Sequence, residues 1–153
     1  MTRIREHIET ALPADAAFDY IADFANSEEW DPGTASSNRL DGGPVGAGSR
    51  FALHVQMGGR TAPMEYRIRD FERPSRVVLV GSGRNVDALD DIRIERVGDR
   101  TVIDYTADIR LGGILRFIQP FLGGTFEKIG RQAAAGMEQT LARLAVQHDE
   151  AVR

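Results

Sequence analysis

Residues 88–109 read ALDDIRIERVGDRTVIDYTADI, and this stretch decides the fold. Apolar and polar residues alternate on both sides of Val97–Arg100, whose central Gly-Asp pair is typical of a two-residue hairpin turn. Pairing Val97 with Arg100 places the apolar side chains of two predicted strands on one face. The pairs on this face are Ile94 with Ile103, Ile92 with Tyr105, Asp90 with Ala107 and Ala88 with Ile109.

The charged residues of the same stretch favour the same register. On the opposite face, Arg93 falls opposite Asp104 and Asp87 falls opposite Arg110. Opposite charges directly across a ladder each stabilise it by about 0.2–1 kcal/mol. A slip of one residue would lose both matches and turn the apolar set towards water. Two independent patterns therefore predict one register for this hairpin.

Further strands are predicted on both sides of it along the chain. Phe51–Met57 and Ala62–Tyr66 alternate around Gly58-Gly59, which predicts a second hairpin with Val55 opposite Ala62, Leu53 opposite Met64 and Phe51 opposite Tyr66. Shorter strands are predicted at Ile4–Ile8, where Ile4, Glu6 and Ile8 share one face, and at Ala35–Leu40 and Val77–Val80. We therefore expect a curved antiparallel sheet of about six to seven strands.

Helices are predicted after the first strand and at the end of the chain. Leu12–Asp15 opens a helix with an apolar stripe, and a second short helix reaches Trp30 before the break at Asp31–Gly33. A long amphipathic helix starts between Ile118 and Thr125 and carries Phe126, Ile129, Ala133, Met137, Leu141 and Leu144 at helical spacing. The fold class is α+β: a curved antiparallel sheet wrapped on this helix, with space between the two.

Composition limits the class of protein. With 153 residues we expect a single domain over residues 1–153, and the net charge of −4 argues against a nucleic-acid partner. The absence of cysteine excludes disulfides, thiolate nucleophiles and Cys-ligated metals. Met1–His7 lacks the apolar core of a signal peptide and no stretch is long enough to span a bilayer, so we expect a cytoplasmic protein. Lys128 is the only lysine, and this preference for arginine suggests a GC-rich bacterial genome.

The middle of the long helix, Gly130–Gly136, consists mostly of glycine and alanine. Glycine inside a helix costs about 1 kcal/mol relative to alanine, so something should offset it. Two readings stay open. Either the helix packs closely on the sheet, or the small side chains leave a hollow between Phe126 and Met137 that holds a ligand.

The order of these motifs resembles the SRPBCC superfamily, the helix-grip group. The matching pieces are Leu12–Asp15, Asp23-Phe24, Trp30–Pro32, Val45–Phe51, Phe71–Arg76 and the last helix through Leu141 and Leu144. The group includes START lipid-transfer domains, birch-pollen-allergen-like proteins and the polyketide cyclase/dehydrase family, which this chain resembles most. The resemblance implies a deep hydrophobic cavity between the sheet and the last helix. It does not imply one chemistry, because members include carriers, cyclases, coenzyme Q-binding relatives and interaction proteins.

Asp90 is the main candidate for chemistry, with Tyr105 beside it. A carboxylic acid desolvated on the apolar face would have a raised pKa and could act as a general acid or base. Alternatively, a bulge at Asp90-Asp91 turns it outward, or it lies at a solvated cavity mouth. Tyr66 and Tyr105 could each donate to a ligand carbonyl, or could be core residues with a wet hydroxyl. The residues expected to bind the ligand are Trp30, Phe51, Leu53, Met64, Tyr66, Ile92, Ile103, Phe126, Ala133 and Met137.

Other kinds of site have little support in the sequence. His7 and His54 are predicted to face away from the core, and with no spaced histidine pair we expect no metal site. The loop Gly42–Gly48 leads into a strand and lacks a following Lys-Ser/Thr, which indicates a turn and not a phosphate site. Arg116 with Phe117 either guards the cavity mouth or is solvated.

Three functions remain open at this point. The first is binding or transport of a small hydrophobic molecule, such as a lipid, polyketide or aromatic metabolite. The second is a cyclase, dehydratase or isomerase that uses Asp90 with Tyr66 or Tyr105 and needs no cofactor. The third is an interaction protein whose partner caps the cavity. The chain could be a monomer or a homodimer.

Overall fold

The computed structural model describes all residues, 1–153, and contains one seven-stranded antiparallel sheet. The strand order is β1-β7-β6-β5-β4-β3-β2, so the first strand pairs with the last. This confirms the sheet that the sequence predicts. The strands are β1 (Thr2–Thr10), β2 (Thr34–Arg39), β3 (Arg50–Met57), β4 (Arg60–Glu72), β5 (Arg76–Gly83), β6 (Val86–Val97) and β7 (Arg100–Leu111).

Both predicted hairpins have the register that their side-chain patterns indicate. In the β6–β7 hairpin Val97 pairs with Arg100, Ile92 with Tyr105 and Asp90 with Ala107. In the β3–β4 hairpin Met57 pairs with Arg60 and Phe51 with Tyr66. The β6–β7 turn is tight because Gly98 has a φ of 62°, in the left-handed region that glycine adopts without strain.

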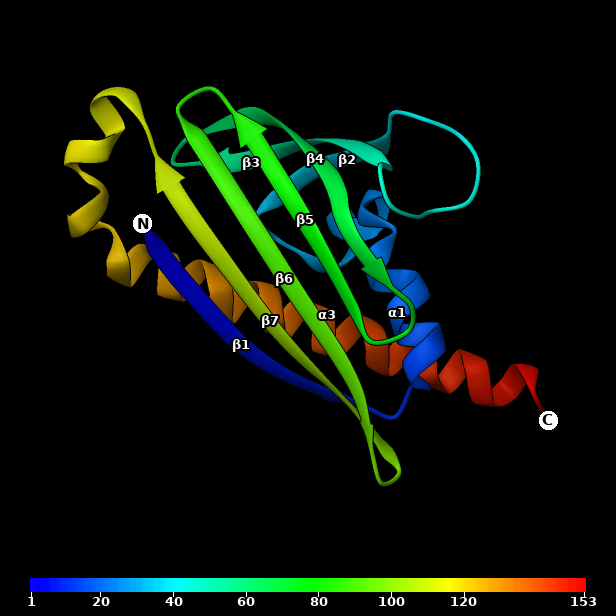
Figure 1. Ribbon diagram of the computed structural model, residues 1–153. Helices are drawn as coiled ribbons and strands as arrows, with labels where there is room; N and C mark the ends of the chain where they lie inside the picture. Colours follow the sequence, from blue (N-terminus) through cyan, green and yellow to red (C-terminus); the bar gives the residue numbers. More distant parts are fainter.

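The helices cover the concave side of the sheet, as Figure 1 shows. The long helix α3 crosses behind the strands, with its main contacts along β1 and against α2. The shorter helix α1 also packs under the sheet, where it buries Ala17, Phe18, Ile21 and Ala22 in the core. No helix is long and apolar enough to cross a membrane. The helical elements are α1 (Ala14–Ala22), η1 (Phe24–Asn26), α2 (Ser27–Trp30), η2 (Gly113–Phe117), η3 (Gln119–Phe121) and α3 (Gly123–Ala151).

Two glycines let α3 approach its neighbours closely. A Cβ atom at Gly136 would overlap the backbone carbonyl oxygen of Trp30, at the end of α2. A Cβ atom at Gly130 would overlap the side chain of Ile4, on β1. These two contacts, called here the glycine seams, explain why the helix tolerates glycine at both positions. Ala133 and Ala134 lie between them, where the helix stands away from the sheet and lines a cavity.

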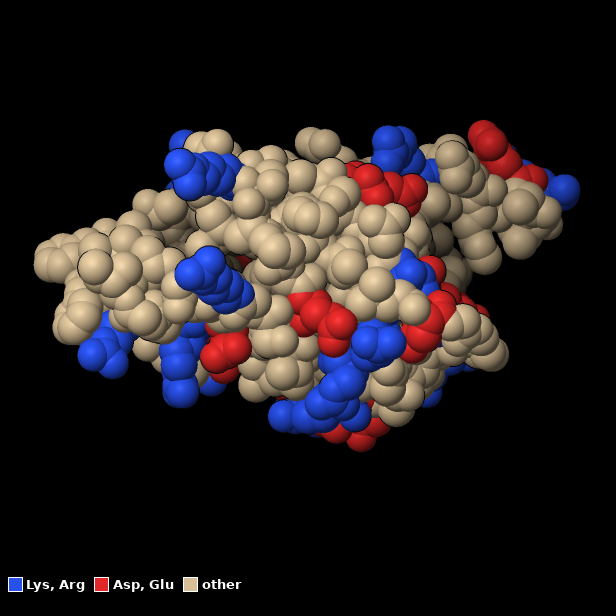
Figure 2. All heavy atoms as spheres, turned by 90° about the horizontal axis from the view of Figure 1, so that it is seen from above, with Lys and Arg blue, Asp and Glu red and all other residues tan.

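The segment that joins β7 to α3 forms a tip at one end of the molecule. Buried Gln119 holds it in place: its side chain accepts a hydrogen bond from the Leu111 N–H at 3.0 Å and donates to the Ile109 carbonyl at 2.7 Å. Ile114 and Phe121 point outward, 78% and 84% exposed. Figure 2 shows this tip as a surface without acidic side chains in that view.

Candidate functional site

A cavity of about 330 Å³ lies between the sheet and α3. This volume falls within the range of small-molecule pockets, about 300–1,000 Å³. Of the 26 residues that line the cavity, 18 are hydrophobic. The lining comes from β1, β3, β4, β6, β7 and α3, and from the end of α2 and the loop after it. The inward positions of the strands thus form one wall, and the small residues of α3 form the other.

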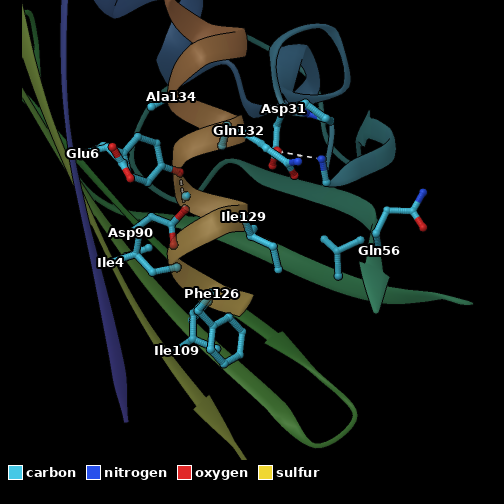
Figure 3. A pocket seen from close by; sticks show the side chains of 18 of the residues that line it. Ile4, Glu6, Asp31, Gln56, Asp90, Ile109, Phe126, Ile129, Gln132 and Ala134 are labelled. Carbon is cyan, nitrogen blue, oxygen red and sulfur yellow. Dashed lines mark hydrogen bonds between the residues drawn. The ribbon is translucent and has the colours of Figure 1, made fainter. Parts of the chain in front are cut away.

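The mouth of the cavity lies on the flank of α3 that faces β3. Most lining residues are buried or half-buried, but Pro32, Gln56, Ile129 and Gln132 are exposed. Figure 3 shows Ile129 and Gln132 projecting from α3 towards the side where Gln56 lies. The glycine seams close the helix against β1 and α2, so this third side is where a ligand would enter.

Asp90 faces the cavity, as the hairpin register predicts. No bulge interrupts β6 at Asp90-Asp91, since both neighbouring ladders run through these residues without a shift. The Asp90 side chain is 6% exposed, and Tyr105 donates its hydroxyl hydrogen to Asp90 Oδ2 (Figure 3). Burial raises the pKa of Asp90 to about 7, although the hydrogen bond from Tyr105 acts in the opposite direction.

Two polar groups at the cavity have no hydrogen-bond partner within the chain. Asp90 Oδ1 forms no hydrogen bond, because the one bond to this carboxyl group reaches Oδ2. Tyr66 is 8% exposed and lines the cavity, and no residue bonds to its hydroxyl group. Both atoms remain accessible to solvent. The side-chain polar atoms that are completely buried and also lack a hydrogen-bond partner are two others, Ser27 Oγ and Trp30 Nε1. Both groups are therefore open to a ligand in the cavity.

Two further carboxylic acids line the cavity. Asp31, in the loop after α2, accepts hydrogen bonds from the Gly33 N–H at 2.8 Å and the Thr34 hydroxyl at 2.9 Å. Burial raises the pKa of Asp31, and these two hydrogen bonds lower it. Glu6 reaches the cavity from β1, where it alternates with outward-facing Arg5 and His7. The alternation of β1 predicts an inward Glu6, but the site residues expected from the sequence do not include it.

The residues predicted to bind a ligand fall into two groups. Phe51, Leu53, Ile92 and Ile103 are buried in the core outside the lining of the cavity. Phe51 packs on Phe24 of η1 with their ring centroids 6.3 Å apart, at the end where the short helices fill the space under the sheet. The inward face of the sheet is therefore longer than the cavity. The cavity lining includes Trp30, Met64, Tyr66, Phe126, Ala133 and Met137, together with the catalytic candidates Asp90 and Tyr105.

The histidines face away from the cavity, as predicted. His7 Nδ1 lies 2.9 Å from Asp104 Oδ1, and His54 Nδ1 lies 3.1 Å from Ser36 Oγ, both on the outer face. No cluster of three or more His, Cys, Asp or Glu side chains is arranged to hold a metal ion. Arg116 stacks over the exposed ring of Phe117, 4.8 Å from its centroid, and neither residue lines the cavity.

Comparison with known proteins agrees with this architecture. A START superfamily protein from Mycobacterium smegmatis superposes with a TM-score of 0.79 at 14% identity, covering 94% of this chain and 99% of that one. The Zhui aromatase/cyclase from Streptomyces sp. R1128 gives 0.72 at 16% identity, covering 99% and 95%. A protein from Thermus thermophilus gives 0.73 at 12% identity, covering 91% and 96%. At such identities the likeness concerns the fold alone.

Sequence comparison adds the family. No curated protein matches the chain. The model of one family, described as polyketide cyclase / dehydrase and lipid transport, matches residues 1–147. Together with the helix-grip fold, this match places the chain in the polyketide cyclase-like group of the SRPBCC superfamily, and the chain belongs to the polyketide cyclase/dehydrase and lipid-transport family.

Proposed function

We propose that this protein binds a small, mostly apolar molecule carrying one polar group in the cavity between the sheet and α3. The observation that carries the proposal is the pair of open polar groups, Asp90 Oδ1 and the Tyr66 hydroxyl, in a mostly apolar wall. Ligand pockets commonly combine an apolar lining with a few polar groups that fix orientation. Buried polar groups without partners cost free energy, which a ligand that pairs with them would recover.

The test is a blocking variant with a matched control on the same helix. Ala133 lines the cavity, whereas Ala135, two residues further on, is exposed and outside the lining. The uncharged fluorophore N-phenyl-1-naphthylamine is titrated into the wild type, Ala133→Phe and Ala135→Phe. We expect Ala133→Phe to weaken binding at least about tenfold, because the ring fills the cavity. Ala135→Phe should bind as the wild type does, and equal binding by all three proteins would contradict the proposal.

Asp90 also favours a second candidate, an enzyme that abstracts a proton next to a carbonyl group. A general base works best when its pKa lies near the operating pH, and burial raises the pKa of Asp90 to about 7. In this reaction Asp90 Oδ1 takes a proton from the carbon beside the carbonyl, while the Tyr66 hydroxyl donates a hydrogen bond to the carbonyl oxygen as negative charge develops there.

Solvent deuterium exchange tests this candidate without knowledge of the natural substrate. The ketone 2-tetralone is apolar and enolises readily, so a base in the cavity would speed deuterium incorporation at its α-carbons. We expect the wild type to accelerate the exchange and Asp90→Asn to remove the acceleration, while the exposed Asp87→Asn on the same strand retains it. Equal acceleration by the wild type and Asp90→Asn would exclude Asp90 as the base.

A further inference from the structure

The lining of the cavity carries charge of one sign only. Glu6, Asp31 and Asp90 contribute three carboxyl groups, and the lining contains no Arg, Lys or His side chain. None of the three takes part in an ion pair, since all ion pairs of the chain lie elsewhere. A chain with 19 basic side chains has therefore placed none of them beside these acids.

This arrangement is costly unless something compensates it. A carboxylate removed from water without a cationic partner raises the free energy of the folded protein. Two of the acids also interact, because the negative charge of Asp31 further raises the pKa of Asp90. Burial comes first among the causes that raise the pKa of Asp31 and of Asp90. The cavity thus holds excess negative charge that a bound cation would neutralise.

The hydrogen-bonding capacity of the site points the same way. An ionised carboxylate only accepts hydrogen bonds. Asp90 Oδ2 already accepts one from Tyr105, and Asp90 Oδ1 remains free. Any ligand that pairs with Oδ1 of the ionised group must therefore bring a donor. An ammonium group brings three donors and a positive charge, whereas a ligand carboxylate would bring a second negative charge and no donor.

Aromatic side chains add to the preference for a cation. Trp30, Tyr66, Tyr105 and Phe126 line the cavity, and the rings of Trp30 and Tyr105 lie 6.1 Å apart, edge to face. Aromatic faces attract cations, and the attraction is strongest for cations that have left water. A metal ion does not fit this description, because no cluster of acids in the chain is arranged to hold one.

We propose that the cavity selects amphipathic amines, molecules with an apolar body and one protonated nitrogen, over carboxylates and phosphates of the same size. This inference rests on the proposed function and specifies the chemistry of the ligand. The nitrogen would lie beside Asp90 Oδ1, within the field of Glu6 and Asp31. The apolar body would occupy the space along Ala133 and Phe126.

A matched series of ligands tests the inference. Octylamine, octanol and octanoate share one hydrocarbon chain and differ only in the charge of the polar end, so calorimetric titration at pH 8 compares the charges directly. We expect octylamine to bind at least about tenfold more tightly than octanoate, with octanol between them. The affinity for octylamine should rise by up to about tenfold between pH 6 and pH 8, because the pKa of Asp90 is about 7.

The titratable groups that line the cavity with Asp90 bear on this pH dependence. They are Tyr105 on β7, Tyr66 on β4, Asp31 after α2 and Glu6 on β1, while α3 contributes none. Asp108 acts on Asp90 from the outer face of β7, where it forms an ion pair with Arg3. Octanol, which carries no charge, should bind with the same affinity at both pH values.

Variants that replace a carboxylate with an amide of the same shape identify the acids that cause the preference for amines. Glu6→Gln and Asp90→Asn each remove a negative charge from the cavity. Glu9→Gln and Asp87→Asn are their controls, on the same strands but exposed and outside the lining. The readout is the ratio of octylamine to octanol affinity, in which any general damage to the cavity cancels. We expect this ratio to fall about fivefold or more in Asp90→Asn, and to fall further when Glu6→Gln and Asp90→Asn are combined in one variant. The ratio should stay unchanged in both controls.

The outcomes separate this inference from the proposed function. If octanol binds but octylamine binds no more tightly than octanoate, the preference for amines is overturned and the binding cavity stands. A ratio that falls equally in the control variants would also overturn it, because the effect would then come from net charge alone. If none of the three ligands binds and N-phenyl-1-naphthylamine does not bind either, the proposed function fails and this inference fails with it.

Discussion

Asp90 is a residue whose position works against the stability of the folded protein. In the unfolded chain its pKa would be near 3.8, and in the fold burial raises the pKa to about 7. Between these two values the folded protein holds a proton that the unfolded chain has lost, so stability falls as the pH rises from about 4 to about 7. Above about pH 7 the loss of folding stability is complete and does not grow further.

The first prediction concerns Asp90→Asn. Asparagine keeps an oxygen that accepts from Tyr105 but carries no charge, so the variant should match the wild type near pH 4. At pH 8 it should be more stable, by up to about 4 kcal/mol. Urea denaturation of both proteins at the two pH values measures the difference. Asp87→Asn, exposed on the same strand, is the control, and a gain at pH 8 as large as that of Asp90→Asn would contradict the prediction.

A second prediction separates the two tyrosines. Tyr105 donates a hydrogen bond to Asp90 that lowers the pKa of this carboxyl group, whereas Tyr66 donates none. In Tyr105→Phe the pKa of Asp90 should therefore rise above its value of about 7, while Tyr66→Phe should change it less. Titration of the Asp90 carboxyl carbon by NMR reports both values. An unchanged or lower pKa in Tyr105→Phe would show that the hydrogen bond does not stabilise the charged form.

At the level of single residues, sequence patterns predicted the direction of side chains better than their surroundings. The alternation of the β6–β7 hairpin places Asp90 inward, and the register is the predicted one. Neither of the two matched charges across the ladder forms an ion pair, because Arg93 pairs with Asp91 and Asp104 lies against His7. The same rule places Phe51 and Ile92 inward, but it does not reveal that packed core and not cavity lies beside them. Asp31 begins the Asp31–Gly33 loop after α2, where no periodic pattern predicts the direction of a side chain, so its place in the wall is apparent only from the fold.

Among the helices and strands, α3 is the element whose packing depends most on glycine. A methyl group at Gly136 would meet a backbone carbonyl, that of Trp30, which cannot move aside as a side chain does. Gly124, in the first turn of the same helix, has open space around the position of a Cβ atom. The two glycines therefore make a matched pair.

The third prediction follows from that pair. Gly136→Ala should destabilise the protein by about 1–3 kcal/mol despite the better helix propensity of alanine, because the helix must shift away from Trp30. Gly124→Ala should stabilise it by up to about 1 kcal/mol. Thermal unfolding of the two variants measures both effects. If Gly136→Ala were as stable as Gly124→Ala, the close approach at Trp30 would not be a constraint.

Close packing and a hollow both occur along the small-residue window of α3. Gly136 packs against α2, Gly130 packs against Ile4 and also lines the cavity, and Ala133 and Ala134 between them line the cavity. Composition alone could not divide the window in this way, because the division depends on which residues meet β1 and α2. The start of α3 is predictable only within a range, since Pro120 and the paired glycines interrupt the helical pattern; the helix begins at Gly123.

For the molecule as a whole, the order of the elements was sufficient to predict the architecture. Two well-defined hairpins, a first strand and a long last helix leave few arrangements that bury all apolar faces. The size of the cavity, in contrast, could not be predicted from the order of the elements. It is the small space left after dozens of side chains have packed, so a few rotamers determine it, and no local pattern in the chain encodes it.

The mouth has a consequence for the speed of ligand entry. The glycine seams close two sides of the cavity. The third side is bordered by Gln56, Ile129 and Gln132, whose side chains are exposed. Exposed side chains change rotamer in picoseconds to nanoseconds, far faster than helices move. Entry should therefore be a single step: in stopped flow, the fluorescence of Trp30, the sole tryptophan, should change at a rate that grows linearly with octylamine concentration and reaches no plateau. A plateau would mean that a slow opening of the helix admits each molecule.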